Sequence, residues 1–532
     1  MNTSAPQAQT GGPRLFLLCA FVFISAFAIR LAYALTRPVP VSADAAYYLM
    51  VAENLYYGRG LVADYVWNYL AGLPAGLPVP SNEYWMPGTS AVIWAAFALA
   101  RSTSLRVAQA PAVVLGALLC AVTAWIAGIL SRRRDAALFA GAAASLNYYL
   151  VELSLSPDHF MLNAILVNVS LIALWAAWRG SPRYALLAGA LAGLAYLTRS
   201  DGALLGIVAL ALTIGLFLRG ERRRGLSLLL CFLAIFALVA APWWTRQTIV
   251  FGSPSGANPL RSAFLTEYDD LFRLDQSPLN LRHYLDATYM LSLDGKMGVA
   301  SVGLRLLLNA VMLCSALALP ALLFRHLRRS SVPWLIYLPI ALLTPAFAVP
   351  FPALRGGLWH IMPAAVPIVL ALSGCSAALL LDLAKRAGPM AARVAAWPAV
   401  IICVLSPGYW WVFPPSAVSQ PGPLYPPVAI QAAAALGPVP PTVLTDNAWG
   451  LYHVAHVPCA QFPSDGAAAA LRVADSIGAA HLITRADAPD RLPAIAEIAG
   501  HPRFQPLARY PAGETRLLVY RILPPSTQPP PR

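Results

Sequence analysis

Long apolar stretches alternate with short, strongly basic segments along the sequence from residue 15 to residue 413. Each stretch is close in length to the roughly 20 residues that a helix needs to cross a bilayer. The pattern predicts a polytopic membrane protein with about eleven spans. The predicted spans are 15–36, 107–130, 136–154, 159–178, 184–198, 202–218, 226–243, 301–323, 333–350, 361–383 and 394–413.

The basic loops predict the orientation of these spans, because Lys and Arg concentrate in cytoplasmic loops. Placing all five inside puts the N-terminus in the cytoplasm and the C-terminus outside. The stretch 89–100 is short, and counting it as a span would put 132–134 on the wrong side, so we interpret it as a juxtamembrane or re-entrant helix. The five basic loops are 132–134, 179–183, 219–224, 325–329 and 385–393.

Three regions then face outward: residues 37–106, residues 244–300 and the tail from residue 414. After a Pro-rich linker at 414–427, short apolar strands alternate with helical stretches such as 465–477, which is typical of a small α/β domain. The strands are expected at 442–445, 481–484 and 516–522. The predicted fold class is therefore mainly α, with a membrane core at 1–413, including both outer loops, and an extracytoplasmic α/β domain at 414–532.

The composition agrees with a membrane protein, since 58% of the residues are hydrophobic and only 11% are charged. A soluble globular protein carries roughly 25% charged residues. The net charge of +14 lies mostly in short loops, so it reflects topology and does not indicate a nucleic-acid partner. Six of the seven cysteines fall in apolar stretches, which excludes an extracytoplasmic intramolecular disulfide and a Cys-pair metal site.

Asp44 is the most informative polar residue, because it follows directly after the first apolar stretch. It begins an amphipathic segment in which Tyr48, Val51 and Leu55 share one helical face. A carboxylate at this position has two interpretations: it caps the helix, or it acts as a general base at the outer membrane surface. The two are compatible.

Further ionisable groups are expected on the same outer side, where each is a functional hypothesis because charge at membrane depth is costly. Several have plainer explanations: Asp158 can start a helix, Arg199 can pair with Asp201, and Arg246 can snorkel. Arginine binds phosphate bidentately and a carboxylate can accept a hydroxyl proton, so the set suits transfer from a lipid phosphate. The set consists of Glu83, Asp158, His159, Arg199, Arg246, Arg355 and His360.

Ordered motifs in the first half of the chain resemble those of the polyprenyl-phosphate-sugar glycosyltransferases of the GT-C superfamily, related to protein O-mannosyltransferases and the lipid A aminoarabinose transferase. Two departures concern the acceptor: Ala45 stands where O-mannosyltransferases usually carry Glu, and Glu83 is followed by Tyr-Trp-Met and a single Pro87 instead of Lys and a Pro pair. The matching segments are 44–55, 86–89, 156–158, 193–202 and 242–246.

The resemblance implies an inverting transfer of a sugar from a polyprenyl-phosphate donor to a glycan, lipid or protein acceptor at the outer face of the bacterial cytoplasmic membrane. Asp44 aligns with the catalytic aspartate, Asp158 with a second acidic position and Arg199 with a position that meets the lipid phosphate. We expect the bilayer, but no nucleic acid, as a further partner. Substrate binding is assigned to Glu83, Arg199, Arg246, Arg355, His360 and Tyr48.

Cofactor use and two alternative functions stay open at this point. Asp44, Asp158 and His159 could coordinate a divalent metal ion if the fold brings them together. A transporter or flippase of lipid-linked sugars would also need a lipid-phosphate site, but transporters typically have internal repeats, which are not evident here. A non-catalytic envelope assembly protein would not require Asp44 or Arg199.

Overall fold

The computed structural model describes residues 13–256, 259–287, 292–390, 394, 397–398, 401, 428–437, 441–486, 492–512 and 515–525. The chain divides into two compact units, each built from three segments. The first unit comprises Met1–Pro40, Met86–Trp243 and Leu293–Gln420, and the second comprises Val41–Trp85, Trp244–Ser292 and Pro421–Arg532. This division differs from a single boundary at residue 413, because most of both predicted outer loops belongs to the same unit as the C-terminal region.

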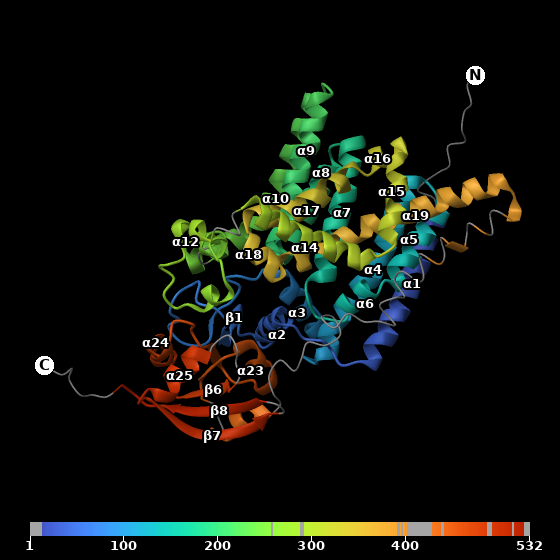
Figure 1. Ribbon diagram of the computed structural model, residues 1–532. Helices are drawn as coiled ribbons and strands as arrows, with labels where there is room; N and C mark the ends of the chain where they lie inside the picture. Colours follow the sequence, from blue (N-terminus) through green and yellow to red (C-terminus); the bar gives the residue numbers. More distant parts are fainter. Residues whose placement is uncertain are drawn as a thin grey trace. The chain divides into compact units, whose positions relative to one another are not determined.

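All regular secondary structure in the described part of the first unit is helical (Figure 1). Several short connections between its helices coincide with the predicted basic loops, and several helices end at Gly or just before Pro. The last part of α10 belongs to the second unit. The helices are α1 (Pro13–Thr36), α3 (Gly88–Ala100), α4 (Leu105–Ser131), α5 (Arg134–Leu146), α6 (Tyr148–Leu153), α7 (Phe160–Arg179), α8 (Tyr184–Thr198), α9 (Leu204–Leu218), α10 (Arg222–Phe251), α14 (Leu293–Val311), α15 (Cys314–Leu323), α16 (Arg325–Ser330), α17 (Val332–Ala348), α18 (Pro350–Pro352) and α19 (Leu358–Ala387).

Among the described residues, six helices are long and apolar enough to cross a membrane, and a seventh span results if α14 and α15, bent by 100°, count as one. The six involve α1, α4, α7, α9, α10 and α19. The larger predicted count also includes the shorter apolar helices α8 and α17 and the stretch 136–154, which the structure breaks into α5 and α6. The predicted span 394–413 lies largely outside the described residues.

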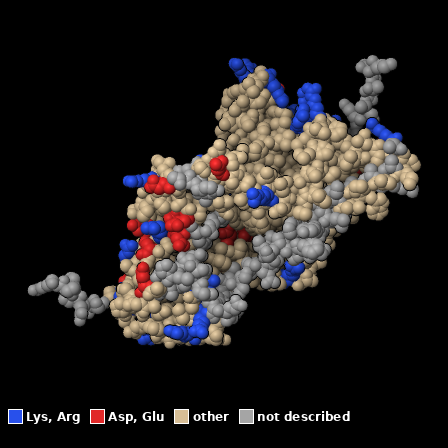
Figure 2. Space-filling model, in the orientation of Figure 1, with Lys and Arg blue, Asp and Glu red and all other residues tan. Residues whose placement is uncertain are grey.

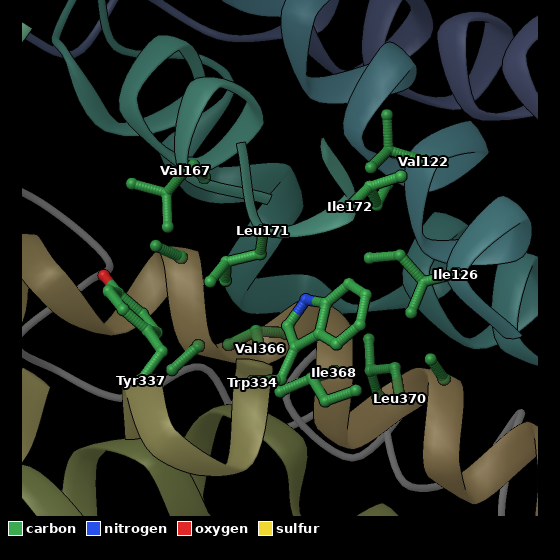
Figure 3. Close-up of a cluster of buried hydrophobic side chains, with 14 of the residues drawn as sticks. Val122, Ile126, Val167, Leu171, Ile172, Trp334, Tyr337, Val366, Ile368 and Leu370 are labelled. Atoms are coloured by element: carbon green, nitrogen blue, oxygen red, sulfur yellow. The ribbon is translucent and has the colours of Figure 1, made fainter. Parts of the chain in front are cut away.

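The core of the first unit lies between α4, α7, α17 and α19, where Trp334 is fully buried among branched apolar side chains (Figure 3). The indole N–H of Trp334 donates to Oδ1 of Asn168 at 3.3 Å, so the polar atom of each side chain has a partner. Small residues allow close helix contacts, as membrane helices require. A Cβ on Gly374 would lie 2.5 Å from the carbonyl oxygen of Ala136, which places α19 directly against α5.

The second unit contains a six-stranded sheet with the order β2-β5-β4-β6-β8-β7. Figure 1 shows β6 (His481–Arg485), β8 (Thr515–Ile522) and β7 (Phe504–Ala512) side by side; β8 is antiparallel to both neighbours. The expected strands at 442–445, 481–484 and 516–522 are confirmed by β4 (Val443–Thr445), β6 and β8. Helices of this unit include α2 (Ala43–Tyr56), α12 (Leu281–Asp286), α22 (Val428–Ala434), α23 (Ala448–Ala455), α24 (Ala467–Ile477) and α25 (Leu492–Gly500).

The edge strand of this sheet comes from the first outer loop. β2 (Tyr65–Val66) pairs in parallel with β5 (Cys459–Gln461), and the Tyr69 hydroxyl donates to the carbonyl oxygen of Gln461. The second outer segment is joined as well, since the Asp465 carboxylate accepts from the backbone N–H groups of Leu274 and Asp275 at 3.0 and 2.9 Å. Three distant parts of the chain therefore build one folded unit.

Candidate active site

In the first unit, Asp158 and His159 form a buried acid–imidazole pair at the start of α7. Both side chains are fully shielded from solvent. The Asp158 carboxylate accepts from the backbone N–H of His159 at 2.7 Å and also faces Nδ1 of the His159 ring. Burial opposes ionisation of Asp158, but the adjoining His159 imidazole outweighs it and holds the pKa of the carboxyl below its ordinary value. The pair therefore presents an ionised acid behind an imidazole.

The other side of the His159 ring meets two further polar groups. Nε2 lies 3.1 Å from Nδ1 of His360, in the first turn of α19, and 3.4 Å from Nη1 of Arg199. A guanidinium can only donate, so a contact from Arg199 requires a lone pair on Nε2. We therefore place a ring proton on Nδ1, the nitrogen that faces Asp158, which is the usual way a carboxylate orients a histidine.

Arg199 lies at the end of α8 and contacts both Asp201 and His159. Its Nε donates to Oδ2 of Asp201 at 3.1 Å, so the pairing considered from the sequence is present, together with the contact to His159. Residues Ser200–Ala203 form a 3-10 turn that leads from the end of α8 into α9. A Cβ on Gly202 would lie 2.3 Å from the backbone nitrogen of Tyr196, so only glycine permits this turn.

In the second unit, Asp44 lies in the first turn of α2, but it is not the residue that caps the helix. The Ser42 hydroxyl caps α2 by accepting from the N–H of Ala45 at 3.0 Å. Oδ1 of Asp44 accepts instead from the indole N–H of Trp85 at 3.0 Å. The Trp85 ring in turn stacks on Tyr47, with ring centroids 4.1 Å apart. A rigid aromatic pair therefore orients the carboxylate.

An aromatic cavity of about 160 Å³ lies beside this pair, within the second unit. Its wall includes Tyr47, Trp67, Trp85 and the carboxyl-bearing Glu83. Burial raises the pKa of Glu83 to about 7, opposed by a weaker contribution from its hydrogen bond with Asn68. Flat aromatic faces beside a carboxyl group that can both donate and accept are suited to a small polyhydroxylated ligand.

Arg246 and its neighbour Gln247 connect α10 to the wall of this cavity. Arg246 Nη1 donates to Oε1 of Gln247 at 2.7 Å, and Nη2 donates to the carbonyl oxygen of Leu61 at 3.4 Å. Gln247 Nε2 donates to the carbonyl oxygen of Asn82 at 2.6 Å. The guanidinium is therefore held near the loop that carries Glu83, and it does not extend as a simple snorkelling side chain.

The remaining predicted residues are placed as follows. Tyr48 is almost fully buried within α2. Arg355 lies in the π-helical turn Ala353–Gly357, but its side chain lies outside the described residues. Of the metal candidates, Asp158 and His159 adjoin within the first unit, while Asp44 belongs to the second.

The residues that orient Asp44 and line the cavity, chiefly Trp85, Tyr47 and Trp67, were not predicted from the sequence. The available signal was the high density of Tyr and Trp in 41–85, which exceeds what a short connecting loop needs. No spacing rule pairs an indole with a carboxylate 41 positions away, so the contact itself could only come from the fold.

Part of the chain is similar to a known protein family. Residues 80–245 match the model of the dolichyl-phosphate-mannose-protein mannosyltransferase family. No curated protein sequence matches the chain.

Solved structures match over nearly the whole chain. The archaeal oligosaccharyltransferase AglB from Archaeoglobus fulgidus, in complex with an inhibitory peptide and a dolichol-phosphate, is 13% identical with a TM-score of 0.59, covering 94% of this chain and 74% of that one. ArnT from Cupriavidus metallidurans, bound to undecaprenyl phosphate, is 15% identical with a TM-score of 0.55, covering 96% and 99%. The Archaeoglobus fulgidus oligosaccharyltransferase complex with Zn and sulfate is 13% identical with a TM-score of 0.55, covering 92% and 72%.

Proposed function

Because the chain has the fold of the GT-C glycosyltransferases, we propose that it transfers a sugar from a polyprenyl phosphate to an acceptor hydroxyl. The reaction takes place at the outer face of the bacterial cytoplasmic membrane. The match of residues 80–245 to a mannosyltransferase family, and the polyprenyl phosphates named with two of the similar structures, support this donor class. The acceptor is a glycan, a lipid or a protein.

Asp44 is the general base of this reaction. The observation that carries the assignment is that Ser42 caps α2, while the Asp44 carboxylate is held by the Trp85 indole. Orientation by a stacked aromatic pair keeps a carboxylate in one geometry, as a positioned base requires. The acceptor hydroxyl proton passes to Asp44 as the new bond to the anomeric carbon forms.

Arg199 neutralises the leaving phosphate. The bond between the anomeric carbon and the phosphate oxygen breaks with its electron pair on that oxygen, so negative charge grows there during transfer. A guanidinium meets such charge with paired N–H donors. Asp201 and the His159–Asp158 pair hold Arg199 from two directions, which supports a positioning role for them. A single displacement without a covalent intermediate gives inversion.

A divalent metal fits the first unit only in part. His159 Nε2 and His360 Nδ1 are 3.1 Å apart, near the roughly 3.3 Å expected between two nitrogen ligands of tetrahedral zinc. Asp158, however, faces the opposite nitrogen of His159, and Arg199 places positive charge beside Nε2. A metal held by the imidazole pair would need further ligands, and would supply positive charge for phosphate. Counting bound Zn²⁺ before and after chelation, with His360→Ala as the comparison, tests this site.

A reconstitution experiment tests the function itself. The purified full chain is placed in liposomes with a radiolabelled polyprenyl-phosphate sugar and membrane lipid or glycan acceptors. We expect label to move to the acceptor, with no transfer when a nucleotide sugar replaces the lipid-linked donor. Movement of the intact donor across the bilayer without any transfer would contradict the proposal and favour a flippase.

A further inference from the structure

A large hollow lies at the basic end of the first unit, and none of its lining residues belongs to the candidate active site. Its volume is about 1130 Å³. It is lined by the ends of α4 and α7, the turn between α9 and α10, and α16. Figure 2 shows Lys and Arg side chains near the places where Figure 1 labels α9 and α16. The six arginines that line it are Arg132, Arg179, Arg219, Arg224, Arg325 and Arg329.

The charge of this lining is strongly unbalanced. Against six arginines stands one carboxylate, Glu221, a formal surplus of five positive charges. Topology alone explains why arginines occupy these loops, but not why they converge on one hollow. Arg222 and Arg223 satisfy the same topological bias from the same turn, yet they do not line the hollow. The convergence is therefore a separate feature.

Three of the arginines are held in place by the surrounding structure. Arg224 donates to Oε2 of Glu221 at 2.8 Å and to the carbonyl oxygen of Trp178 at 2.5 Å. The Arg219 guanidinium lies 4.8 Å from the centroid of the Trp178 ring, and Arg179 donates to the Ser330 hydroxyl at 3.1 Å. Side chains fixed in this way lose less entropy when they bind a ligand.

The other three arginines, Arg132, Arg325 and Arg329, form no ion pair with any residue that the structure describes. The adjacent Arg133 shows the contrast, because it pairs with both Asp135 and Asp382. Like charges that converge without an acid are stabilised when an anion joins them.

We propose that this hollow binds a phosphate-bearing anion. Guanidinium groups match phosphate oxygens bidentately, and basic pockets between membrane helices on the cytoplasmic side suit anionic headgroups. The basic end is the end that the charge pattern assigns to the cytoplasm. The volume is large for a lone phosphate and is on the scale of known small-molecule sites, roughly 300–1,000 Å³. A phospholipid headgroup and a soluble phosphate compound share this chemistry.

The test measures thermal unfolding of the detergent-solubilised full chain against three probes: dioctanoyl phosphatidylglycerol, dioctanoyl phosphatidylcholine and inorganic pyrophosphate. The test variant is the double substitution Arg325→Gln with Arg329→Gln. The matched control is Arg222→Gln with Arg223→Gln, which removes the same charge from outside the hollow. The quantity compared is the phosphatidylglycerol concentration that gives half of the maximal stabilisation. We expect this concentration to rise about tenfold in the test variant, equivalent to the loss of one to two strong phosphate contacts. It should stay unchanged in the control.

Each outcome decides the proposal. Saturable stabilisation by phosphatidylglycerol alone, lost in the test variant, supports a lipid headgroup. The same variant-dependent stabilisation by pyrophosphate supports a soluble phosphate. Equal effects of the two double variants would contradict the proposed site. So would the absence of stabilisation by both phosphatidylglycerol and pyrophosphate. If the test variant loses its cooperative unfolding transition without ligand, the single substitution Arg132→Gln replaces it.

Discussion

At the scale of single residues, His159 organises the first unit's polar cluster. It turns one ring nitrogen to Asp158 and the other to His360 and Arg199. The sequence placed these four residues on one side of the membrane through the charge pattern, and the structure brings them into contact. Which nitrogen meets which partner depends on side-chain directions set by α7 and α19, and no sequence pattern contains that information.

Substitution of Arg199 should slow sugar transfer, because the variant stabilises the charge on the donor phosphate less well. Arg199→Gln keeps a polar side chain but removes the charge, and the loss of one charge-assisted contact, about 1.5–3 kcal/mol, predicts a decrease in kcat/KM of about tenfold or more. Arg199→Lys should recover only part, because an ammonium cannot bind bidentately. Steady-state kinetics with varied donor measure this. A Gln variant with the kinetics of Arg183→Gln, an exposed-loop control, would contradict the role.

The raised pKa of Glu83 should make the stability of the protein depend on pH. Burial raises its pKa to about 7, whereas an exposed glutamate titrates at about 4.3. Between these values the folded state holds more protons than the unfolded state, so stability falls as pH rises through this window. Glu83→Gln should remove part of the fall between pH 5 and pH 7. Glu53, whose pKa burial also raises to about 7, accounts for another part.

Thermal unfolding midpoints across pH 5–8 test this interpretation, with wild type, Glu83→Gln and Glu53→Gln measured in the same detergent. The double variant should show the flattest profile. A Glu83→Gln profile that follows the wild type at every pH would show that Glu83 is not protonated in the folded protein.

At the scale of elements, the turn between α8 and α9 positions Arg199. Its position could be predicted, because the expected spans 184–198 and 202–218 leave only residues 199–201 between them. The helix break between α5 and α6 could not be predicted from hydropathy, because 136–154 is apolar throughout most of its length. The fully buried Arg30 of α1 donates to the carbonyl oxygens of Ala144 and Ser145 beside the break. These are tertiary contacts from another helix, which hydropathy does not contain.

The turn makes a sharp prediction about glycine. Gly202→Ala would place a Cβ 2.3 Å from a backbone nitrogen, so the turn must shift and carry Arg199 with it. We expect a lower unfolding midpoint and a loss of transfer. Gly215→Ala in α9 is the matched control, since a Cβ there meets nothing within 4 Å and helix propensity favours Ala by up to ~1 kcal/mol. Equal stability of the two variants would show that the turn tolerates a side chain.

At the scale of the whole molecule, the second unit is assembled from three distant segments. The sequence predicted the C-terminal strands, because they are apolar and bounded by turn residues. It did not predict that 65–66 would add an edge strand, since a two-residue strand has no period to detect. The fold class could therefore be predicted, whereas the unit to which each segment belongs could not.

This assembly predicts how the chain responds to cutting. A protease site inserted between residues 413 and 428 should yield a C-terminal fragment that stays bound under native conditions. The β2–β5 pairing and the hydrogen bond from the Tyr452 hydroxyl to Asp64, 2.8 Å long, connect the fragment to the first outer loop. Size-exclusion chromatography before and after cleavage measures this. Free elution of the fragment without denaturant would contradict a shared fold.

If Asp44 takes the acceptor proton, Asp44→Asn should remove the general base and leave the fold intact. Asn keeps the size of the side chain and an oxygen for the Trp85 indole, but it cannot act as a base at neutral pH. In liposomes with a polyprenyl-phosphate sugar and acceptor, we predict a decrease in the transfer rate of roughly 10²–10⁴-fold, the usual contribution of a general base. Glu53→Gln on the same helix is the matched control and should transfer at the wild-type rate. Transfer by Asp44→Asn at a rate within a few-fold of wild type would show that Asp44 is not the general base.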